Sequence, residues 1–581
     1  MSGAEKGLNE AQLRAVTHDQ GPLLVVAGPG TGKTRVLTHR ISHIIQDRGV
    51  APERVLAITF TNQAAREISA RVSTLLGQKG QGPVIGTFHA WALSFLRRNL
   101  GEAARLLIDE QEASALLSRA MEEAGIPLKD LRATREAVSR IKLAGPCPED
   151  GDRLLNCLSA YQGLLSRHGL WDFDDLLVEA LRLLREDPDR GRPDALLVDE
   201  FQDVNRIQSD LVRAMAPSTG EVTVIGDPNQ SIYGFRGAAP EFLDRFVQDF
   251  PQATVIRLDT AYRSPQRFLD AATHVIRAEG LISSRGEGPR ILAKGFPDPE
   301  EEAAWIARKV DELVGGVSFE SLNSGGCRSG PLQGLSGIAV LYRINAMGEA
   351  ISRAFSARGI PHQRADRKDP FEDRDLRLAG RLWDAVRARH RGGRAYLAAR
   401  LAEESFLPER EIEKALSDLS GLSGLTLFEA ILKRFSLTLP VFIQKAIEKA
   451  FEADPEPVSF SSLVREGADL FVPGVEAAAL MSLHAAKGLE FPVVFIAGCE
   501  NGILPWGDSD PGEERRLFYV GLTRASQILH ITWAERRVFH GRTQCGGMSP
   551  FLRDIPDGLI SLEEARPRPR RRPRQKGLFG S

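Results

Sequence analysis

The sequence predicts an α/β protein whose strands form parallel sheets, and three observations carry that prediction. Short apolar runs alternate with longer amphipathic segments along most of the chain. Many of these runs are apolar at every position, which is typical of strands that a parallel sheet buries on both faces. Two long stretches lack such runs, which predicts two mainly helical insertions.

The predicted strands share apolar, often β-branched sequences bounded by polar or glycine-containing segments. They are Leu23–Val26, Val55–Phe60, Val84–Thr87, Leu196–Val198, Val222–Ile225, Val255–Leu258, Ile338–Tyr342, Met481–Leu483, Val493–Ile496 and Leu529–Thr532. The helical insertions cover residues 91–185 and 373–473, which are rich in Leu, Ala, Arg and Glu. The Gly- and Ser-rich stretch 321–337 is predicted to be a flexible surface loop.

Composition narrows the functional class. With 581 residues, of which 42% are hydrophobic, the chain predicts several domains of an ordinary soluble globular protein. The net charge of −2 means that any nucleic-acid site must be a local groove. The five cysteines show no C-x-x-C pair, which argues against a zinc ribbon or iron–sulfur cluster and predicts a reducing, cytoplasmic location. Neither a signal peptide nor an apolar run of membrane-spanning length is found.

A glycine-rich loop after the first strand is the strongest chemical signal. Closely spaced glycines let backbone N–H groups converge on phosphate oxygens at a helix N-terminus, where the helix dipole favours negative charge. Lys33 is predicted to reach the β- and γ-phosphates, and the Thr34 hydroxyl to ligate Mg²⁺. The residues predicted to hold nucleotide here are Ala27, Gly28, Pro29, Gly30, Thr31, Gly32, Lys33, Thr34 and Arg35.

A second acidic motif, Val198-Asp199-Glu200-Phe201-Gln202-Asp203, follows another apolar run. Asp199 is predicted to hold the magnesium ion, and Glu200 to polarise a water molecule for attack on the γ-phosphate. A phosphate loop paired with an acidic strand end predicts ATP hydrolysis, with ATP and Mg²⁺ as cofactors.

Further polar and aromatic clusters follow other predicted strands, where ligands bind in open α/β sheets. The clusters are Thr59-Phe60-Thr61-Asn62, Gly86-Thr87-Phe88-His89 and the run from Gly226 to Arg236. Aromatic side chains beside arginine can stack unpaired bases, which makes Tyr233 and Phe235 candidates for contact with a nucleic acid. The alternative is that both rings belong to the core.

Arginines in the second half of the chain form another candidate group. Arg263 and Arg524 are placed to stabilise charge on a transferring phosphoryl group from across a cleft. Arg515 and Arg516 precede the second of them. The alternative for each is an ordinary surface ion pair. A loop from His484 to Phe491 carries basic, acidic and glycine residues after a strand.

Together these motifs resemble those of the UvrD/PcrA/Rep branch of superfamily 1 DNA helicases, collinearly over nearly the whole chain. The most specific segments are Leu8-Asn9-Glu10-Ala11-Gln12, Thr59-Phe60-Thr61-Asn62-Gln63-Ala64-Ala65, Leu483-His484-Ala485-Ala486-Lys487-Gly488-Leu489-Glu490-Phe491-Pro492 and Tyr519-Val520-Gly521-Leu522-Thr523-Arg524-Ala525. The resemblance implies two RecA-like domains, 1A and 2A, each with a mainly helical insertion, 1B and 2B. Their boundaries would be 1–90 and 186–258 for 1A, 91–185 for 1B, 259–372 and 474–562 for 2A, 373–473 for 2B, and 563–581 for a disordered basic tail.

The resemblance also implies residue roles. Around ATP, Gln12 would hydrogen-bond the adenine, Tyr262 would stack on it, Glu490 would contact the ribose, Gln230 would sense the γ-phosphate, and Arg263 and Arg524 would be the arginine fingers. The residues implied to bind DNA are Phe60, Thr87, His89, Tyr233, Phe235, Arg236, His484 and Phe539.

The chain departs from the family pattern at several positions. Ala261 stands where asparagine usually precedes the Tyr-Arg pair, Phe235 replaces a frequent tryptophan, and Gly234 replaces an arginine between the aromatic residues. The stretch 373–473 is also compact for a 2B insertion. These changes bear on base stacking and unwinding rather than on hydrolysis.

The expected function is an ATP-dependent 3′→5′ helicase or translocase on single-stranded and 3′-tailed duplex DNA, acting in repair or replication restart. The alternative is a DNA-stimulated translocating ATPase that removes proteins from DNA without processive unwinding.

The C-terminal end offers a partner motif. Gln575, Leu578 and Phe579 resemble the Gln-x-x-Leu-Phe peptides that bind the bacterial sliding clamp, carried here after an arginine- and proline-rich stretch. The alternative is a basic tail that contacts DNA phosphates only.

Overall fold

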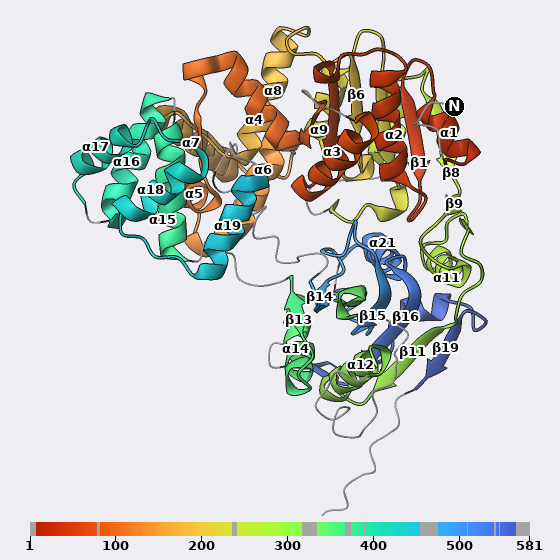
Figure 1. Cartoon of the computed structure of the whole chain (residues 1–581). Helices are drawn as coiled ribbons and strands as arrows, with labels where there is room; N and C mark the ends of the chain where they lie inside the picture. Colours follow the sequence, from red (N-terminus) through yellow and green to blue (C-terminus); the bar gives the residue numbers. More distant parts are fainter. Residues whose placement is uncertain are drawn as a thin grey trace, which may run out of the picture. The chain divides into compact units, whose positions relative to one another are not determined.

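The computed structural model describes residues 7–564 except 78–81, 235–236, 238–240, 316–333, 366–372, 389, 406, 454–459, 461–474, 508, 540–541 and 545. The chain forms two compact units (Figure 1). Unit 1 comprises Met1–Gly28, Gly32–Leu258 and Lys368–Asp469, and unit 2 comprises Pro29–Thr31, Asp259–Arg367 and Leu470–Ser581.

Unit 1 is built on a six-stranded sheet with strand order β3-β2-β6-β7-β1-β8. All its strand pairs are parallel, as predicted. The strands are β1 (Leu23–Ala27), β2 (Val55–Thr59), β3 (Val84–Thr87), β6 (Ala195–Val198), β7 (Val222–Gly226) and β8 (Thr254–Leu258). Helices that border this sheet are α1 (Glu10–Val16), α2 (Lys33–Gln46), α3 (Asn62–Leu76), α9 (Arg206–Met215) and α10 (Glu241–Asp249).

Both faces of this sheet are buried, which explains why its strands are apolar throughout. Leu23 and Val25 of β1 pack in one hydrophobic core with Val36 and Ile41 of α2. Leu24, between them, packs in a second core on the opposite face. Because alternate residues of a strand point to opposite faces, each face needs its own apolar partner.

The two predicted insertions are helical, as expected. The first contains α4 (Phe88–Leu100), α5 (Glu110–Glu123), α6 (Leu131–Ala144), α7 (Asp152–His168) and α8 (Phe173–Glu186), with β4 (Leu106–Leu107) beside β5 (Leu170–Trp171). The second contains α15 (Arg374–Arg387), α16 (Arg391–Ser405), α17 (Glu409–Asp418), α18 (Gly424–Arg434) and α19 (Val441–Ala453).

The two insertions share a single hydrophobic core within unit 1. Leu116 and Met121 of α5 lie in the same cluster of buried side chains as Leu382 and Trp383 of α15. The second insertion therefore packs with unit 1, although the segments that flank it in sequence belong to unit 2.

Unit 2 is built on a seven-stranded sheet, again with parallel pairs throughout, in the order β13-β14-β12-β15-β16-β11-β19. Its strands are β11 (Ile291–Phe296), β12 (Ile338–Tyr342), β13 (His362–Arg364), β14 (Ala478–Ser482), β15 (Phe491–Ala497), β16 (Ala525–Ala534) and β19 (Ile560–Glu563). The accompanying helices are α11 (Gln266–Ile276), α12 (Pro299–Leu313), α14 (Gly348–Ala357) and α21 (Pro511–Leu522).

Every predicted strand overlaps an observed one, but three strands of this sheet were not predicted: β11, β13 and β19. Polar residues interrupt their sequences, as in His362-Gln363-Arg364 of β13. β13 and β19 are the edge strands of the sheet, where one side of the backbone needs no strand partner and apolar patterning is weak. Within the described part of the chain, no helix is both long and apolar enough to cross a membrane.

Candidate nucleotide-binding site and nucleic-acid interface

The glycine-rich loop joins β1 to the N-terminus of α2, in the strand–loop–helix arrangement that its sequence predicts. Gly30 and Gly32 both have positive φ, at 72° and 89°. A Cβ on Gly32 would lie 2.8 Å from Gln12 Nε2, and one on Gly30 would lie 2.6 Å from Arg263 Cβ. Both conformation and space therefore require glycine, and no side chain caps the first turn of α2, as expected of a helix start that binds an anion.

Gln12 lies beside this loop but also has a structural role. It is 1% exposed, and its Oε1 accepts a 3.1 Å hydrogen bond from Asn9 N in a capping box at the start of α1. Its Nε2 faces Gly32, so the amide group is fixed at the loop. Arg35, also predicted to bind nucleotide, has its guanidinium against Gly7.

Lys33, Asp199 and Glu200 form a compact charged group in unit 1. Lys33 Nζ lies 3.8 Å from Glu200 Oε1. Among the described residues, Lys33 Nζ and Asp199 Oδ1 are buried without a hydrogen-bond partner. Burial, followed by the neighbouring Glu200 charge, raises the pKa of Asp199 to about 7, against the opposing effect of Lys33.

Buried polar groups without partners are uncommon in folded proteins and often mark ligand sites. Carboxylate and hydroxyl oxygens are ligands that Mg²⁺ prefers, so Asp199 and Thr34, in the first turn of α2, fit such an ion. A bound cation would also favour the ionised form of Asp199.

Sequence reasoning missed two residues that are hydrogen-bonded near Glu200: Gln202 and Asp227. Gln202 Nε2 donates to Glu200 Oε2 at 2.5 Å, and Gln202 Oε1 accepts from Asp227 N at 2.9 Å. Asp227 Oδ2 in turn accepts from Gln230 Nε2 at 2.6 Å. The predicted γ-phosphate sensor is therefore linked to the predicted base through Gln202 and Asp227. The motif quoted around Asp199 contained Gln202, but spacing alone does not reveal its partners.

Unit 2 carries the other residues predicted to contact ATP. Tyr262 is 42% exposed, and its N donates to Gly30 O at 2.8 Å, which places this aromatic residue at the loop. Arg263 Nε donates to Glu490 Oε2 at 2.5 Å. The structure thus brings together the predicted arginine finger and the predicted ribose contact as an ion pair.

Arg524 is held differently. It is 1% exposed, and its guanidinium donates to Val520 O at 2.9 Å and to Leu489 O at 3.1 Å. The two preceding arginines follow the ion-pair alternative: Arg515 pairs with Asp554 at 2.5 Å, and Arg516 lies 3.7 Å from Asp510.

Three residues predicted to bind DNA lie near the carboxyl ends of β2 and β3. Phe60 follows β2, and its ring contacts Phe88 edge-on at 6.3 Å. Thr87 Oγ1 caps α4 by accepting from Ala90 N at 3.3 Å. The His89 ring lies 5.3 Å from that of Phe173, which is 38% exposed. Phe173 begins α8 and was not among the predicted residues.

The remaining predicted DNA residues are described only in part. Tyr233 is half-buried and follows the fully buried Ile232, so its side chain is not fully enclosed in the core. His484 is half-buried in the loop after β14. The backbone of Phe539 pairs with Arg542 in the hairpin of β17 (Arg537–Phe539) and β18 (Arg542–Gln544). Phe235, Arg236, Gln575, Leu578 and Phe579 lie outside the described residues, as does most of the predicted loop 321–337.

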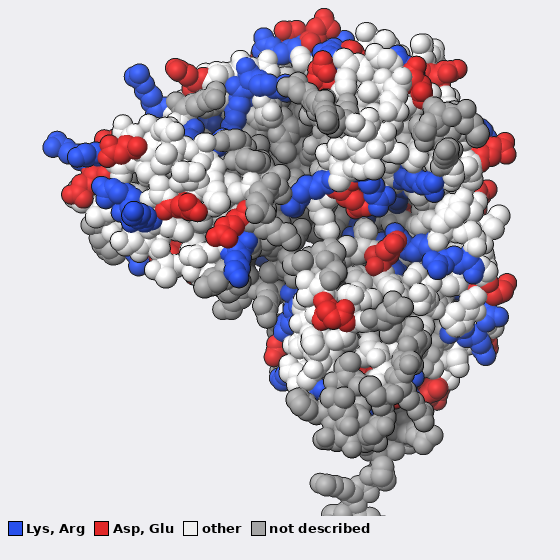
Figure 2. All heavy atoms as spheres, viewed as in Figure 1, with Lys and Arg blue, Asp and Glu red and all other residues white. Residues whose placement is uncertain are grey.

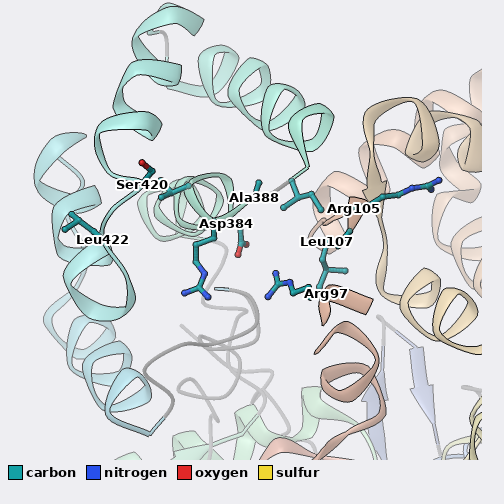
Figure 3. Close-up of a pocket in the computed structure, with 11 residues that line it drawn as sticks. Arg97, Arg105, Leu107, Asp384, Ala388, Ser420 and Leu422 are labelled. Carbon is teal, nitrogen blue, oxygen red and sulfur yellow. The ribbon is translucent and has the colours of Figure 1, made fainter. Parts of the chain in front are cut away.

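The face of the molecule in Figure 2 shows basic and acidic side chains interspersed over the described surface, in line with the near-zero net charge. Within unit 1, a cavity of about 290 Å³ lies between the two helical insertions. Arg97 and Asp384 point into it, whereas the side chain of Arg105 extends away (Figure 3). Burial raises the pKa of Asp384 to about 7, against the lowering effect of a hydrogen bond from Phe460 N.

The comparison with known proteins agrees with this geometry. Residues 8–251 match the UvrD/REP helicase N-terminal domain, and residues 256–379 and 459–536 match the UvrD-like helicase C-terminal domain. The chain is 29% identical to the ATP-dependent DNA helicase PcrA of Staphylococcus epidermidis, over 96% of this chain and 88% of that protein. It is 29% identical to PcrA of Staphylococcus aureus, over 98% and 89%. The chain belongs to the UvrD/PcrA-type helicase family.

Proposed function

We propose that this protein is an ATP-dependent DNA helicase that moves 3′→5′ along single-stranded DNA and opens 3′-tailed duplexes. The observation that carries the proposal is the group formed by Lys33, Asp199 and Glu200 at the N-terminus of α2. Lys33 Nζ and Asp199 Oδ1 are buried without a hydrogen-bond partner among the described residues, as in a site that accepts a phosphate and its counter-ion. The PcrA relatives, which are named ATP-dependent DNA helicases, support the same activity.

The residues divide the chemistry between them. The α2 N-terminus and Lys33 bind the phosphates, and Thr34 and Asp199 hold Mg²⁺, which neutralises phosphate charge when bound. Glu200 accepts the proton of the attacking water, and Gln230 contacts the γ-phosphate. Arg263 and Arg524 stabilise charge on the transferred group, which requires Arg263 to exchange its Glu490 partner for phosphate.

The domain boundaries given above are part of this proposal. Domain 1A would hold the six-stranded sheet of unit 1, and domain 2A the seven-stranded sheet of unit 2. The two helical insertions would be 1B and 2B. The free thiols of Cys147, Cys157 and Cys499 support the cytoplasmic location predicted from the sequence. A role in repair or replication restart rests on the family resemblance.

ATP turnover tests the motor directly. Wild-type protein should hydrolyse ATP faster with a 3′-tailed duplex than without, and Lys33→Ala should lose at least about 100-fold in turnover because it removes a phosphate ligand. Arg132→Ala is the matched control, because this side chain is 88% exposed. Equal turnover by wild type and Lys33→Ala would contradict the proposal.

Strand displacement separates the helicase from the alternative, a translocating ATPase that removes proteins from DNA. The helicase should release the short strand of a 3′-tailed duplex and leave a 5′-tailed one intact. Stimulated turnover without release of either strand would favour the alternative. The departures at Gly234 and Phe235, beside Tyr233, keep this second candidate relevant.

A clamp partner is proposed for the C-terminal motif. A peptide with an apolar Leu-Phe anchor can be captured by a groove on a partner, and Leu578 and Phe579 supply that anchor. The full-length protein should be retained on immobilised bacterial sliding clamp, and replacement of both residues by alanine should abolish retention. Unchanged retention would contradict the clamp proposal and favour the alternative, a basic tail that contacts DNA phosphates only.

A further inference from the structure

Gln202 is fully buried at a position where it contacts two parts of the candidate hydrolytic site. It lies in the 3-10 turn Phe201–Asp203, directly after Glu200, and is 0% exposed. Its side-chain amide has both ends occupied: Nε2 donates to Glu200 Oε2 at 2.5 Å, and Oε1 accepts from Asp227 N at 2.9 Å. Nε2 also lies 3.4 Å from Asp203 Oδ2. Exchanging the amide nitrogen and oxygen would lose these bonds, so the amide has one favoured orientation.

The loop after β7 is attached to Gln202 at both of its ends. Asp227, which begins the loop, is bound through its N, and Ser231 Oγ donates to Gln202 O at 3.0 Å. Between them, Asp227 Oδ2 accepts from Gln230 Nε2 at 2.6 Å and Asp227 Oδ1 accepts from Asn229 N at 3.0 Å. Gln230 is itself 3% exposed, and its side-chain amide is bonded to Asp227.

We propose that Gln202 is a positioning residue that holds Glu200 and, through Asp227, Gln230 in one fixed arrangement for hydrolysis of the γ-phosphate. This inference rests on the proposed function, which assigns Glu200 as base and Gln230 as γ-phosphate contact. In the reaction, the water oxygen forms a bond to the γ-phosphorus, and the bond from that phosphorus to the β,γ-bridging oxygen breaks. The water proton passes to Glu200, and ADP and phosphate leave.

Two local features accompany the position of Gln202, one in the backbone of Glu200 and one at Gly226. Glu200 has φ of 50°, a left-handed conformation that few residues other than glycine adopt, so its backbone must be held by its surroundings. Gly226 leaves room for the amide, because a Cβ there would lie 2.8 Å from Gln202 Oε1 and 3.2 Å from Gln202 N. The glycine and the glutamine therefore form one tightly fitted contact.

The test replaces the amide and leaves the charged groups in place. Gln202→Leu has similar size but can neither donate to Glu200 nor accept from Asp227. We expect kcat for ATP to fall by about 100-fold, the effect of displacing a catalytic group by about 1 Å, while KM changes by less than about threefold.

Gln208→Leu is the matched control, since Gln208 is also buried but bonds within the capping box of α9. Thermal unfolding and binding of a fluorescent ADP analogue are measured for each variant. A merely structural role would lower the unfolding temperature of Gln202→Leu and leave kcat of the folded protein unchanged, and that result would overturn the inference. Gly226→Ala, which displaces the same amide, should reproduce the loss of kcat. If wild type itself lacks ATPase activity, the proposed function fails instead.

Discussion

The shared core of the two helical insertions makes a strong prediction about Arg381. This residue of α15 is 6% exposed and reaches across to α5 of the first insertion. Its Nε lies 3.2 Å from Asp109 Oδ2, its Nη2 lies 3.0 Å from Glu112 Oε1, and it also pairs with Glu404 of α16. Asp109 additionally caps α5, and Glu112 is 1% exposed.

Replacing Arg381 with methionine would leave the buried carboxylate of Glu112 with one positively charged partner fewer. Removing one partner of a buried ion pair costs about 3–5 kcal/mol. Arg400, at 3.3 Å from Glu112, and the Tyr396 hydroxyl, at 2.7 Å, remain. We therefore expect the lower end of this range, about 3 kcal/mol. Arg132→Met, which breaks an exposed pair with Glu136, should cost no more than about 0.5 kcal/mol.

Native-state amide exchange is the appropriate assay, because a chain of several domains need not unfold in one step. Arg381→Met should lower the opening free energy of α5 and α15 amides together by about 3 kcal/mol, since one core holds both. A loss below 1 kcal/mol, or a loss confined to α15, would refute the reasoning that the insertions form one cooperative body.

Three further predictions concern single sites. Asp384→Asn should flatten the pH dependence of stability: the raised pKa means that the folded protein binds this proton more tightly than the unfolded chain, so stability falls as pH rises from about 4 to about 7. Urea unfolding at pH 5 and pH 8 checks this. An equal change in the free energy of unfolding between the two pH values in wild type and variant would contradict it. Gly32→Ala should weaken binding of a fluorescent ADP analogue by at least about tenfold, because its Cβ would strike Gln12, whereas Gly49→Ala, with similar φ and open space, should not. Glu490→Gln should loosen the Arg263 ion pair and raise KM for ATP, if Glu490 contacts ribose, with little change in kcat; a kcat loss above about tenfold with unchanged KM would contradict that role.

Local sequence determined most strands of the two large sheets and the chemistry of the phosphate loop. Fully apolar runs such as Leu23–Val26 are typical of strands that are covered on both faces, so the pattern predicted parallel sheets. The loop from Ala27 to Thr34 is equally local, because its glycines act through their own backbone angles.

Tertiary structure alone decided the contacts between distant segments. Gln202 meets Asp227, and Arg263 meets Glu490, across 25 and 227 residues of sequence, and no periodicity encodes such pairs. The second insertion packs into the core of the first for the same reason: helices with an apolar face bury it against whichever complementary face the fold brings near. Sequence therefore determined which side chains carry chemistry, and the packing of the whole chain decided which of them act on one another.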